Sequence, residues 1–291
     1  MFSRFSRSWE LTKQSWGVLR ADKHLMVFPL LSSVLTVLVC VSFFVPALLI
    51  VGPVLGESGA KGGEQIAPGM KVAGFALLFV LYFVVNVIVT FFNASLISCA
   101  LARFNGEESG AAAGMSAALK RWPQILGWAA VNATVGVVIQ MLKERVGWLG
   151  QLVLGLAGVA WNIATFFVVP VLVVEGVGPF KAVGRSFDVL KKTWGESLIA
   201  QVGVGLVMGL ATLGTLAATV AAGIGLGVVT DSVVVATVVI CAGILLTLTV
   251  ALVGSTLKTI LVAACYRMAT TGTVPEGFEG SSLKGMFAPK R

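Results

Sequence analysis

The stretch that decides the fold is Val72–Ala102, VAGFALLFVLYFVVNVIVTFFNASLISCALA, which contains no charged residue. A helix rises about 1.5 Å per residue, so this stretch is long enough to cross a hydrocarbon core of about 30 Å. Five more apolar stretches of about twenty residues or longer accompany it: Met26–Val51, Trp122–Met141, Leu149–Val174, Leu198–Val228 and Ser232–Ala264. The sequence therefore predicts an all-α polytopic membrane protein with six transmembrane helices.

The composition supports the same fold class. Of the 291 residues, 57% are hydrophobic and 12% are charged, and the mean hydropathy is +0.96. Soluble domains contain about 45–50% apolar and about 25% charged residues, which excludes a water-soluble globular enzyme. The net charge is +8, and most of the 21 Lys and Arg residues fall at one set of span ends. Positive residues are retained in the cytoplasm, so we expect both termini there and no nucleic-acid partner.

Two polar segments, before the first and fifth spans, share a pattern. The matching positions are Arg7-Ser8-Trp9-Glu10 with Arg185-Ser186-Phe187-Asp188, Lys13 with Lys191, and Trp16-Gly17 with Trp194-Gly195. The aromatic residues recur at helical spacing and share one face. Each segment is predicted to be an amphipathic helix in the cytoplasmic interface, with aromatic rings at the acyl boundary and basic residues toward headgroups. A weaker third copy occupies Gly114–Trp122.

The copies divide the chain into three repeat units in a pseudo-threefold arrangement. Each unit is an interfacial helix followed by a hairpin of two spans: 1–105, 106–177 and 178–269, with a flexible cytoplasmic tail at 270–291. Alternatively, Trp and Lys recur near membrane interfaces without common ancestry. The predicted lipid-interface residues are Trp9, Lys13, Trp16, Lys120, Trp122, Arg185, Lys191, Lys192 and Trp194.

Polar residues inside the spans have two interpretations. Asn86, Asn93, Asn132 and Asn162 could bond between helices, at about 0.6 kcal/mol each and up to about 1.7 kcal/mol, or line a polar path. Lys258 lies within the sixth span, where a charge is costly. It could snorkel to the cytoplasmic interface or pair with a buried partner, for which Glu175 is the candidate.

Three features of the sequence bear on how the helices pack: the length of the fifth and sixth spans, a proline and a pair of glycines. Because the fifth and sixth spans are longer than the bilayer core, they must tilt, project beyond the bilayer or break, for example at Gly243 or Gly254. Pro170 is predicted to kink the fourth span. Gly205 and Gly209 form a G-x-x-x-G pattern, which we interpret as packing inside the bundle, with self-association as the alternative.

The residues that usually carry chemistry are absent from the sequence. Paired carboxylates within the bilayer, H-E-x-x-H, G-x-S-x-G and phosphate-binding loops do not occur. The four cysteines lie in apolar stretches, and His24 is the one histidine. We therefore expect no catalytic residue, no cofactor and no metal.

Several segments resemble a known family. They are Phe167–Pro179 (FVVPVLVVEGVGP) with Arg185-Ser186 and Lys192–Glu196, supported by Phe91-Phe92-Asn93, Ile125–Trp128 and Ser15-Trp16 to Pro29-Leu30. In these segments the chain resembles a prokaryotic family of uncharacterised multi-pass membrane proteins, known only as a domain of unknown function. The resemblance implies a prokaryotic inner (plasma) membrane and supplies no catalytic or ligand-binding residue.

The function that we expect is a non-catalytic membrane scaffold or accessory subunit. Its basic helices would hold anionic headgroups on the cytoplasmic side. The alternative is a channel or transporter for a small solute or lipid, lined by the four asparagines with Glu175 and Lys258; an intramembrane enzyme is the third hypothesis. The expected partners are membrane lipids, with a homo-oligomer or a membrane-protein partner as further expectations.

Overall fold

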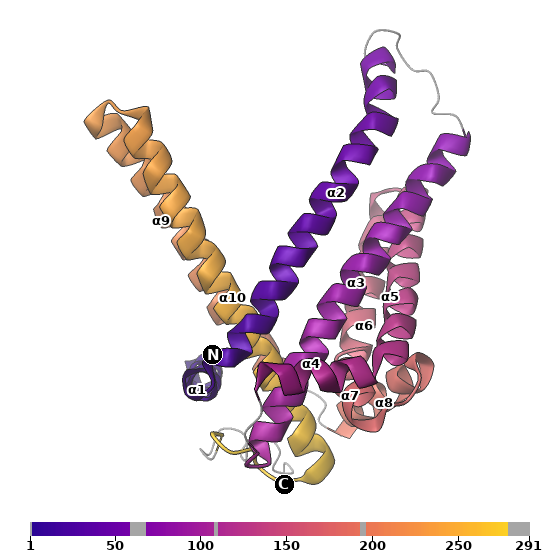
Figure 1. Cartoon of the computed structure of the whole chain (residues 1–291), viewed down its shortest axis with the longest axis vertical. Helices are drawn as coiled ribbons and strands as arrows, with labels where there is room; N and C mark the ends of the chain where they lie inside the picture. Colours follow the sequence, from indigo (N-terminus) through magenta and orange to yellow (C-terminus); the bar gives the residue numbers. More distant parts are fainter. Residues whose placement is uncertain (1, 59–67, 108–109, 193–195, 279–291) are drawn as a thin grey trace. The chain divides into compact units, whose positions relative to one another are not determined.

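The computed structural model describes residues 2–58, 68–107, 110–192 and 196–278 (Figure 1). The regular elements in these ranges are all helical, so the predicted all-α fold is confirmed. They are α1 (Phe2–Ala21), the 3₁₀ helix η1 (Lys23–Met26), α2 (Val27–Ser58), α3 (Pro68–Phe104), α4 (Ala111–Lys120), α5 (Trp122–Lys143), α6 (Trp148–Ala164), α7 (Val168–Glu175), α8 (Pro179–Lys192), α9 (Glu196–Thr230) and α10 (Val233–Thr271).

Six helical stretches in the described residues are long and apolar enough to cross a membrane, as the sequence predicts. They cover the first part of α2, most of α3, α5, the α6–α7 pair, most of α9, and α10. Helix α2 continues to Ser58 and α3 begins at Pro68, so both helices extend beyond the apolar stretches Met26–Val51 and Val72–Ala102. By its helices the chain is a multi-pass membrane protein.

The chain forms two compact units, counting the described residues only. Unit 1 is drawn from Met1–Pro29, Leu96–Ala113 and Val189–Arg291, and unit 2 from Leu30–Ser95 and Gly114–Asp188. The bounds of these units differ from those of the three predicted repeats. The units are defined by which residues pack together, whereas a repeat is defined by matching sequence. The threefold repeat stays a prediction.

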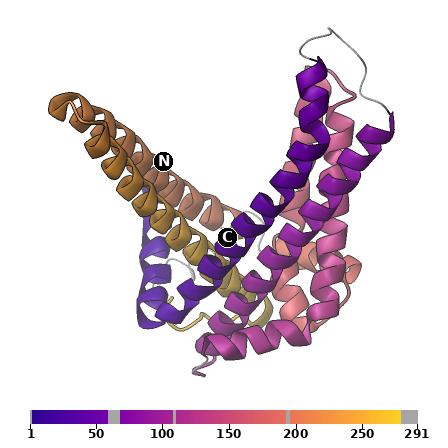
Figure 2. The same ribbon diagram turned by 45° about the horizontal axis from the view of Figure 1, so that its top comes forward.

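In unit 1, α9 and α10 lie side by side (Figures 1 and 2). Neither Gly243 nor Gly254 breaks α10, which is continuous. Instead, a side chain at Gly243 would collide with Thr219, and one at Gly254 would lie 3.1 Å from Met208 Cβ. The two glycines thus permit close approach of α9 and α10. Helix α1 packs on both of them.

The segment after α10 contacts α3 through Phe278. Helix α10 continues to Thr271, and Gly272 ends it with a φ of 70°. Phe278 is fully buried and packs edge-on against Phe104, with ring centroids 5.9 Å apart. The flexible tail predicted from residue 270 stays a prediction, while α10 includes its first two residues and Phe278 packs against Phe104. Residues 279–291 lie outside the described part.

In unit 2, the fourth predicted span consists of two helices. Helix α6 ends at Ala164 and α7 begins at Val168, so the span is interrupted before Pro170, where the sequence predicts a kink. Proline lacks an N–H, and its ring collides with the carbonyl group four residues earlier, here that of Phe166. The interruption therefore lies where Pro170 makes a continuous helix unfavourable.

Candidate functional site

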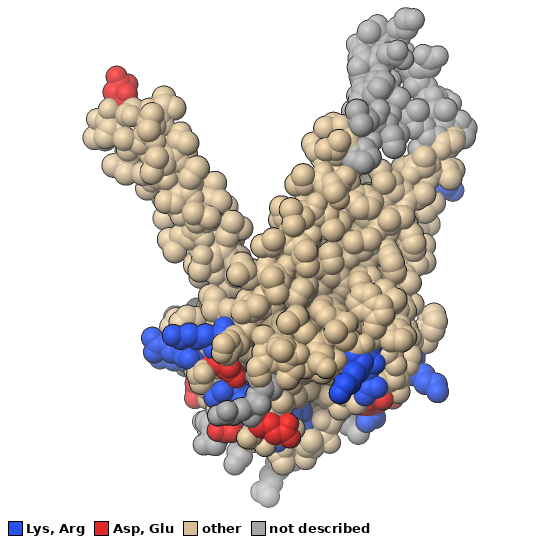
Figure 3. Space-filling view, in the orientation of Figure 1, with Lys and Arg blue, Asp and Glu red and all other residues tan. Residues whose placement is uncertain are grey.

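The outward side of α1 carries aromatic and basic residues that the sequence assigns to the membrane interface. Trp9 is 49% exposed and Trp16 is 40% exposed. Lys13 Nζ lies 5.9 Å from the centroid of the Trp9 ring, and Arg20 Cζ lies 5.9 Å from that of Trp16. Lys and Arg side chains gather over α1 in Figure 3. We call these four residues the α1 stripe; it consists of two aromatic–cation pairs, each four residues apart.

The opposite side of α1 is buried, a feature that the sequence analysis does not predict. This side carries Leu11, Thr12, Ser15, Val18 and Leu19. Because α1 packs on α9 and α10, the buried side fixes the rotation of the helix about its axis. The α1 stripe therefore has a defined orientation away from these two helices.

Helix α8 likewise has an exposed side and a buried side; its residues up to Asp188 belong to unit 2 and its last four residues to unit 1. Phe180 is 79% exposed and Phe187 is 41% exposed, whereas Ala182 and Ser186 are fully buried. Lys191 is exposed, and the side chain of Arg185 is 44% exposed. The backbone of Lys192 ends the helix, but its side chain lies outside the described part, as does all of Trp194.

The junction of α4 and α5 carries the remaining predicted interface residues. Lys120 is exposed at the end of α4, and Trp122 is 40% exposed at the start of α5. The Trp122 ring also packs edge-on against Phe91, at a centroid distance of 5.9 Å. Trp122 therefore has one side on the protein and one side exposed.

Ser186 bridges the interruption between α6 and α7. Its Oγ donates a hydrogen bond to Ala164 O at 2.8 Å and accepts one from Phe167 N at 3.0 Å. Ser186 is fully buried. A break in a membrane-spanning helix leaves backbone groups that water cannot satisfy, so another part of the protein must bond to them. The hydroxyl group of α8 fulfils this role.

Side chains from the α4–α5 region hold the end of α7. Arg121 Nε donates to Val173 O and Gln124 Nε2 donates to Gly176 O, both at 3.2 Å. Gly176 has a φ of 64°, the left-handed conformation that often terminates a helix. The Arg121 guanidinium occupies the position that a side chain at Gly176 would take. Helix α7 is therefore held by side chains at both ends.

Glu175 forms an ion pair with Arg185, at 2.9 Å between Oε1 and Nε. Glu175 is a candidate partner of Lys258 by sequence, but in the structure it is paired with Arg185. Both side chains are partly exposed, so the pair contributes about 0–1 kcal/mol. Its main effect is to join the end of α7 to α8.

Two of the segments that carry the family resemblance, Ile125–Trp128 and Phe167–Pro179, meet at this junction. Pro179 Cγ lies 2.8 Å from where a Cβ at Gly127 would be, so only glycine fits there without displacement. Gly176, Glu175 and Arg185 also belong to segments that carry the resemblance. We therefore interpret these motifs as packing and capping elements of unit 2.

Two of the four predicted asparagines form a hydrogen-bonded chain inside unit 2. Trp161 Nε1 donates to Asn132 Oδ1 at 3.0 Å, and Asn132 Nδ2 donates to Asn86 Oδ1 at 2.6 Å. Asn86 Nδ2 in turn donates to Tyr82 O at 2.8 Å. The Trp161 ring stacks on Trp128 at 6.0 Å. This chain joins α3, α5 and α6, as expected for interhelical hydrogen bonding.

Replacing Asn132 with leucine should lower the free energy of unfolding by about 1–3 kcal/mol, because Asn86 Oδ1 and Trp161 Nε1 both lose their partner. Thermal unfolding in detergent, followed by circular dichroism, measures the change. Asn162→Leu is the matched control, since Asn162 lies on the same bundle but is exposed. Equal stability of the two variants would contradict the proposed contribution of the chain.

The other predicted polar-path residues do not join the asparagine chain. Asn93 is half-buried on α3, and Asn162 is exposed on α6. Lys258 lies in unit 1, half-buried, with its Cε 3.6 Å from where a Cβ at Gly205 would be. The structure thus brings Asn86 and Asn132 together and places each of the others elsewhere.

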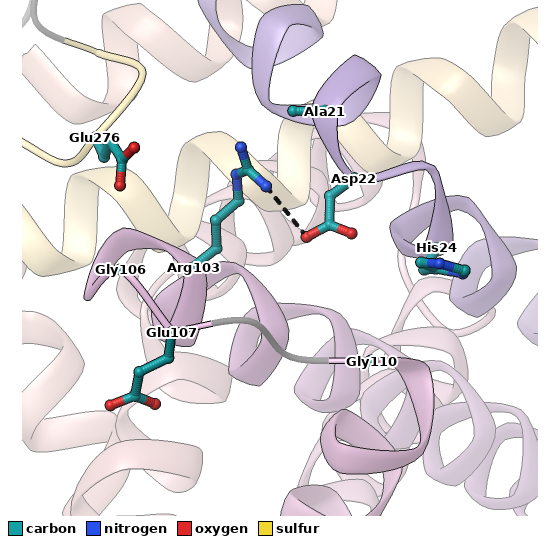
Figure 4. Close-up of a pocket in the computed structure, with 8 residues that line it drawn as sticks. All are labelled: Ala21, Asp22, His24, Arg103, Gly106, Glu107, Gly110 and Glu276. Carbon is teal, nitrogen blue, oxygen red and sulfur yellow. Dashed lines mark hydrogen bonds and ion pairs between the residues drawn. The ribbon is translucent and has the colours of Figure 1, made fainter.

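A polar cavity of about 520 Å³ lies in unit 1 (Figure 4). Three chain segments meet there, after α1, after α3 and after α10. The cavity is lined by Ala21, Asp22, His24, Arg103, Gly106, Glu107, Gly110 and Glu276. Arg103 points toward Asp22 and forms an ion pair with it at 3.4 Å (Figure 4). This pair ties the end of α3 to the segment between α1 and η1.

The described residues contain no group of three or more His, Cys, Asp or Glu side chains that could hold a metal ion. In the sequence Ser186 stands out only as a serine of the repeated pattern, and neither Arg121 nor Gln124 has a predicted role. Pro170 inside an apolar span predicts a break in the helix, and a broken span requires a polar side chain that bonds to the freed backbone groups. Pro170 could therefore have indicated a role for a serine such as Ser186. We find no sequence signal for Arg121 or Gln124.

Residues 72–277 match DUF6159, a family of unknown function. The match runs from α3 to the turn after α10, and it does not include α1, η1 and α2. Neither the curated proteins nor the solved structures contain a match to the chain. The resemblance to an uncharacterised family is confirmed.

Proposed function

The chain belongs to DUF6159, a family of unknown function, and we propose that it is a non-catalytic membrane scaffold or accessory subunit. In this proposal it lies in a prokaryotic inner membrane with both termini in the cytoplasm, and it holds anionic headgroups there. The α1 stripe supports the proposal most directly. Its rings and cations face outward while the other side of α1 is packed on α9 and α10. Such a helix suits the boundary between acyl chains and headgroups.

The aromatic–cation pairs are compatible with lipid binding. A ring attracts the neighbouring cation but does not neutralise it, so Lys13 and Arg20 keep their positive charge for a phosphate group. Each Lys or Arg near an anionic surface contributes about 1 kcal/mol. Together with exposed Lys120, Lys181 and Lys191, these cations support binding of anionic lipids by several separate helices.

Transport of a small solute or lipid is the second candidate function. The interruption between α6 and α7 favours it, because broken spans recur in transporters. The hydroxyl bridge of Ser186 and the bonds between Asn86 and Asn132 favour a packed interior instead. Flux into liposomes that contain the purified protein distinguishes the two functions.

The α1 stripe should report anionic lipid through its tryptophans. We expect stronger quenching of Trp16 fluorescence by brominated phosphatidylglycerol than by brominated phosphatidylcholine in reconstituted vesicles, with the Trp16 signal taken as the difference between the unmodified protein and Trp16→Phe. The double variant Lys13→Glu and Arg20→Glu should lower the preference for the anionic lipid about ten-fold or more, since it reverses two charges.

The matched control is Lys143→Glu, which changes a lysine at the end of α5 predicted to face the opposite side of the membrane. It should leave the lipid preference unchanged. Quenching of Trp16 that is independent of lipid charge, or absent with both lipids, would reject the scaffold proposal in this form.

A further inference from the structure

Helix α8 contacts the break between α6 and α7 with one side and exposes another side. Ala182 and Ser186, one helical turn apart, are fully buried, and Ser186 Oγ bonds to Ala164 O and Phe167 N across the break. Phe180, on another side of the helix, is 79% exposed. These residues all belong to unit 2. A rotation of α8 about its axis therefore moves the exposed side and the hydroxyl bridge together.

The exposed side of α8 lies close to the end of a membrane-crossing stretch. The fourth such stretch ends at Glu175, and α8 begins at Pro179. Lys181 is exposed next to Phe180. Helix α8 is too polar to cross a bilayer, but it suits the plane of the interface, with rings toward acyl chains and cations toward headgroups. An anionic bilayer surface is therefore the partner that fits the exposed side.

The break depends on α8 for its hydrogen bonds. Within a membrane-crossing stretch, water cannot replace the Ser186 hydroxyl group as the partner of Ala164 O and Phe167 N. Arg185 Nε lies 2.9 Å from Glu175 Oε1, so α8 also holds the far end of α7 (Figure 1). Opening of the break and undocking of α8 are therefore one local equilibrium, in which these contacts form and are lost together.

We propose that anionic lipid bound at the exposed side of α8 holds the break between α6 and α7 closed. A ligand shifts an equilibrium by the difference between its affinities for the two states. The bilayer surface contacts Phe180 and Lys181 together only when α8 is docked with that side outward. The charge of the lipid is thereby coupled to the backbone inside the span. This coupling rests on the proposed function, because the interfacial helices must hold headgroups, and it adds that α8 controls a span.

The coupling is tested by amide hydrogen exchange of the full chain in nanodiscs, with mass spectrometry of a peptide that covers residues 164–168. Exchange should be about five-fold slower in phosphatidylglycerol than in phosphatidylcholine, which is the factor that one lysine near an anionic surface supplies. Lys181→Gln should remove most of this difference and leave exchange in phosphatidylcholine unchanged. Lys143→Gln, at the end of α5, is the matched control and should retain the difference.

Other arms separate the coupling from general effects of the lipid. Ser186→Ala should abolish the lipid dependence, because the amide of Phe167 has then lost its acceptor. A peptide that covers residues 80–90 of α3 should exchange equally in both lipids; equal slowing there would show general stabilisation and overturn the proposal. Inorganic phosphate at millimolar concentration should not slow exchange in phosphatidylcholine, and slowing would overturn the role of the membrane. A lipid dependence that is absent, or that Lys181→Gln leaves unchanged, would also overturn the proposal.

The double variant Lys13→Glu and Arg20→Glu distinguishes this coupling from the function of the α1 stripe. It should lower the lipid preference at Trp16 and leave the lipid dependence of residues 164–168 intact. A normal preference at Trp16 without lipid dependence at the break would reject the coupling alone and leave the scaffold function standing. Loss of both in the double variant would show that the lipid acts through α1, and it would overturn the role of α8.

Discussion

Replacing Ser186 with alanine is expected to lower the free energy of unfolding of unit 2 by about 2–4 kcal/mol. The substitution removes the hydrogen bonds to Ala164 O and from Phe167 N at a fully buried position. Leaving a buried backbone group without its partner costs about 1–3 kcal/mol, and two groups are affected here. Thermal or denaturant unfolding of the purified protein in detergent measures the difference.

Two variants separate this effect from a general effect of losing a serine. Ser186→Thr retains a hydroxyl group and should recover part of the stability. Ser42→Ala removes an exposed hydroxyl that donates to Val39 O within α2, and it should change the stability by less than about 0.5 kcal/mol. If Ser186→Ala is as stable as Ser42→Ala, the hydroxyl bridge does not stabilise the broken span.

Replacing Gly176 with alanine is expected to destabilise unit 2 by about 2–4 kcal/mol. A residue other than glycine at a φ of 64° costs about 1 kcal/mol or more. The new methyl group also displaces the Arg121 guanidinium and thereby breaks its bond to Val173 O. The change is measured as a shift of the unfolding midpoint of the detergent-solubilised protein.

Other glycine variants identify which of the two costs dominates. Gly178→Ala is the matched control, because a Cβ there has no neighbour within 4 Å and the backbone has an ordinary φ. Gly106→Ala has a φ of 79° but open space, so it measures the backbone cost alone. Combining Gly176→Ala with Arg121→Ala removes the collision. An unfolding midpoint for Gly176→Ala equal to that of Gly178→Ala would show that neither cost is present.

The spans could be predicted from the sequence because each is an uninterrupted apolar stretch longer than the bilayer core. The predicted start at Trp122 and the observed start of α5 coincide, and Pro123 follows at a position where a helix tolerates proline. The ends of α2 and α10 were less predictable. Polar residues such as Glu57 and Thr270 continue these helices beyond the apolar stretch, and helix propensity permits this in water.

The outward faces were also predictable in part. Spacing places Trp9 and Trp16 on one side of α1, and both are exposed. The buried side of α1 was not predictable, because its Leu, Ser, Thr and Val residues resemble those of any helix and become a contact surface only against α9 and α10. For the same reason the sequence indicated Glu175 as a candidate partner of Lys258, whereas in the structure Glu175 forms its ion pair with Arg185.

Sequence alone determined that this protein is helical, that it crosses a membrane with six apolar stretches, and that its aromatic and basic residues recur before particular spans. These properties are local, because about twenty neighbouring residues decide whether a helix partitions into lipid. Tertiary structure alone decided how polar groups are satisfied. Ser186 meets Ala164 across 22 residues and Arg121 meets Val173 across 52, since such bonds depend on which helices lie adjacent and no local pattern encodes that.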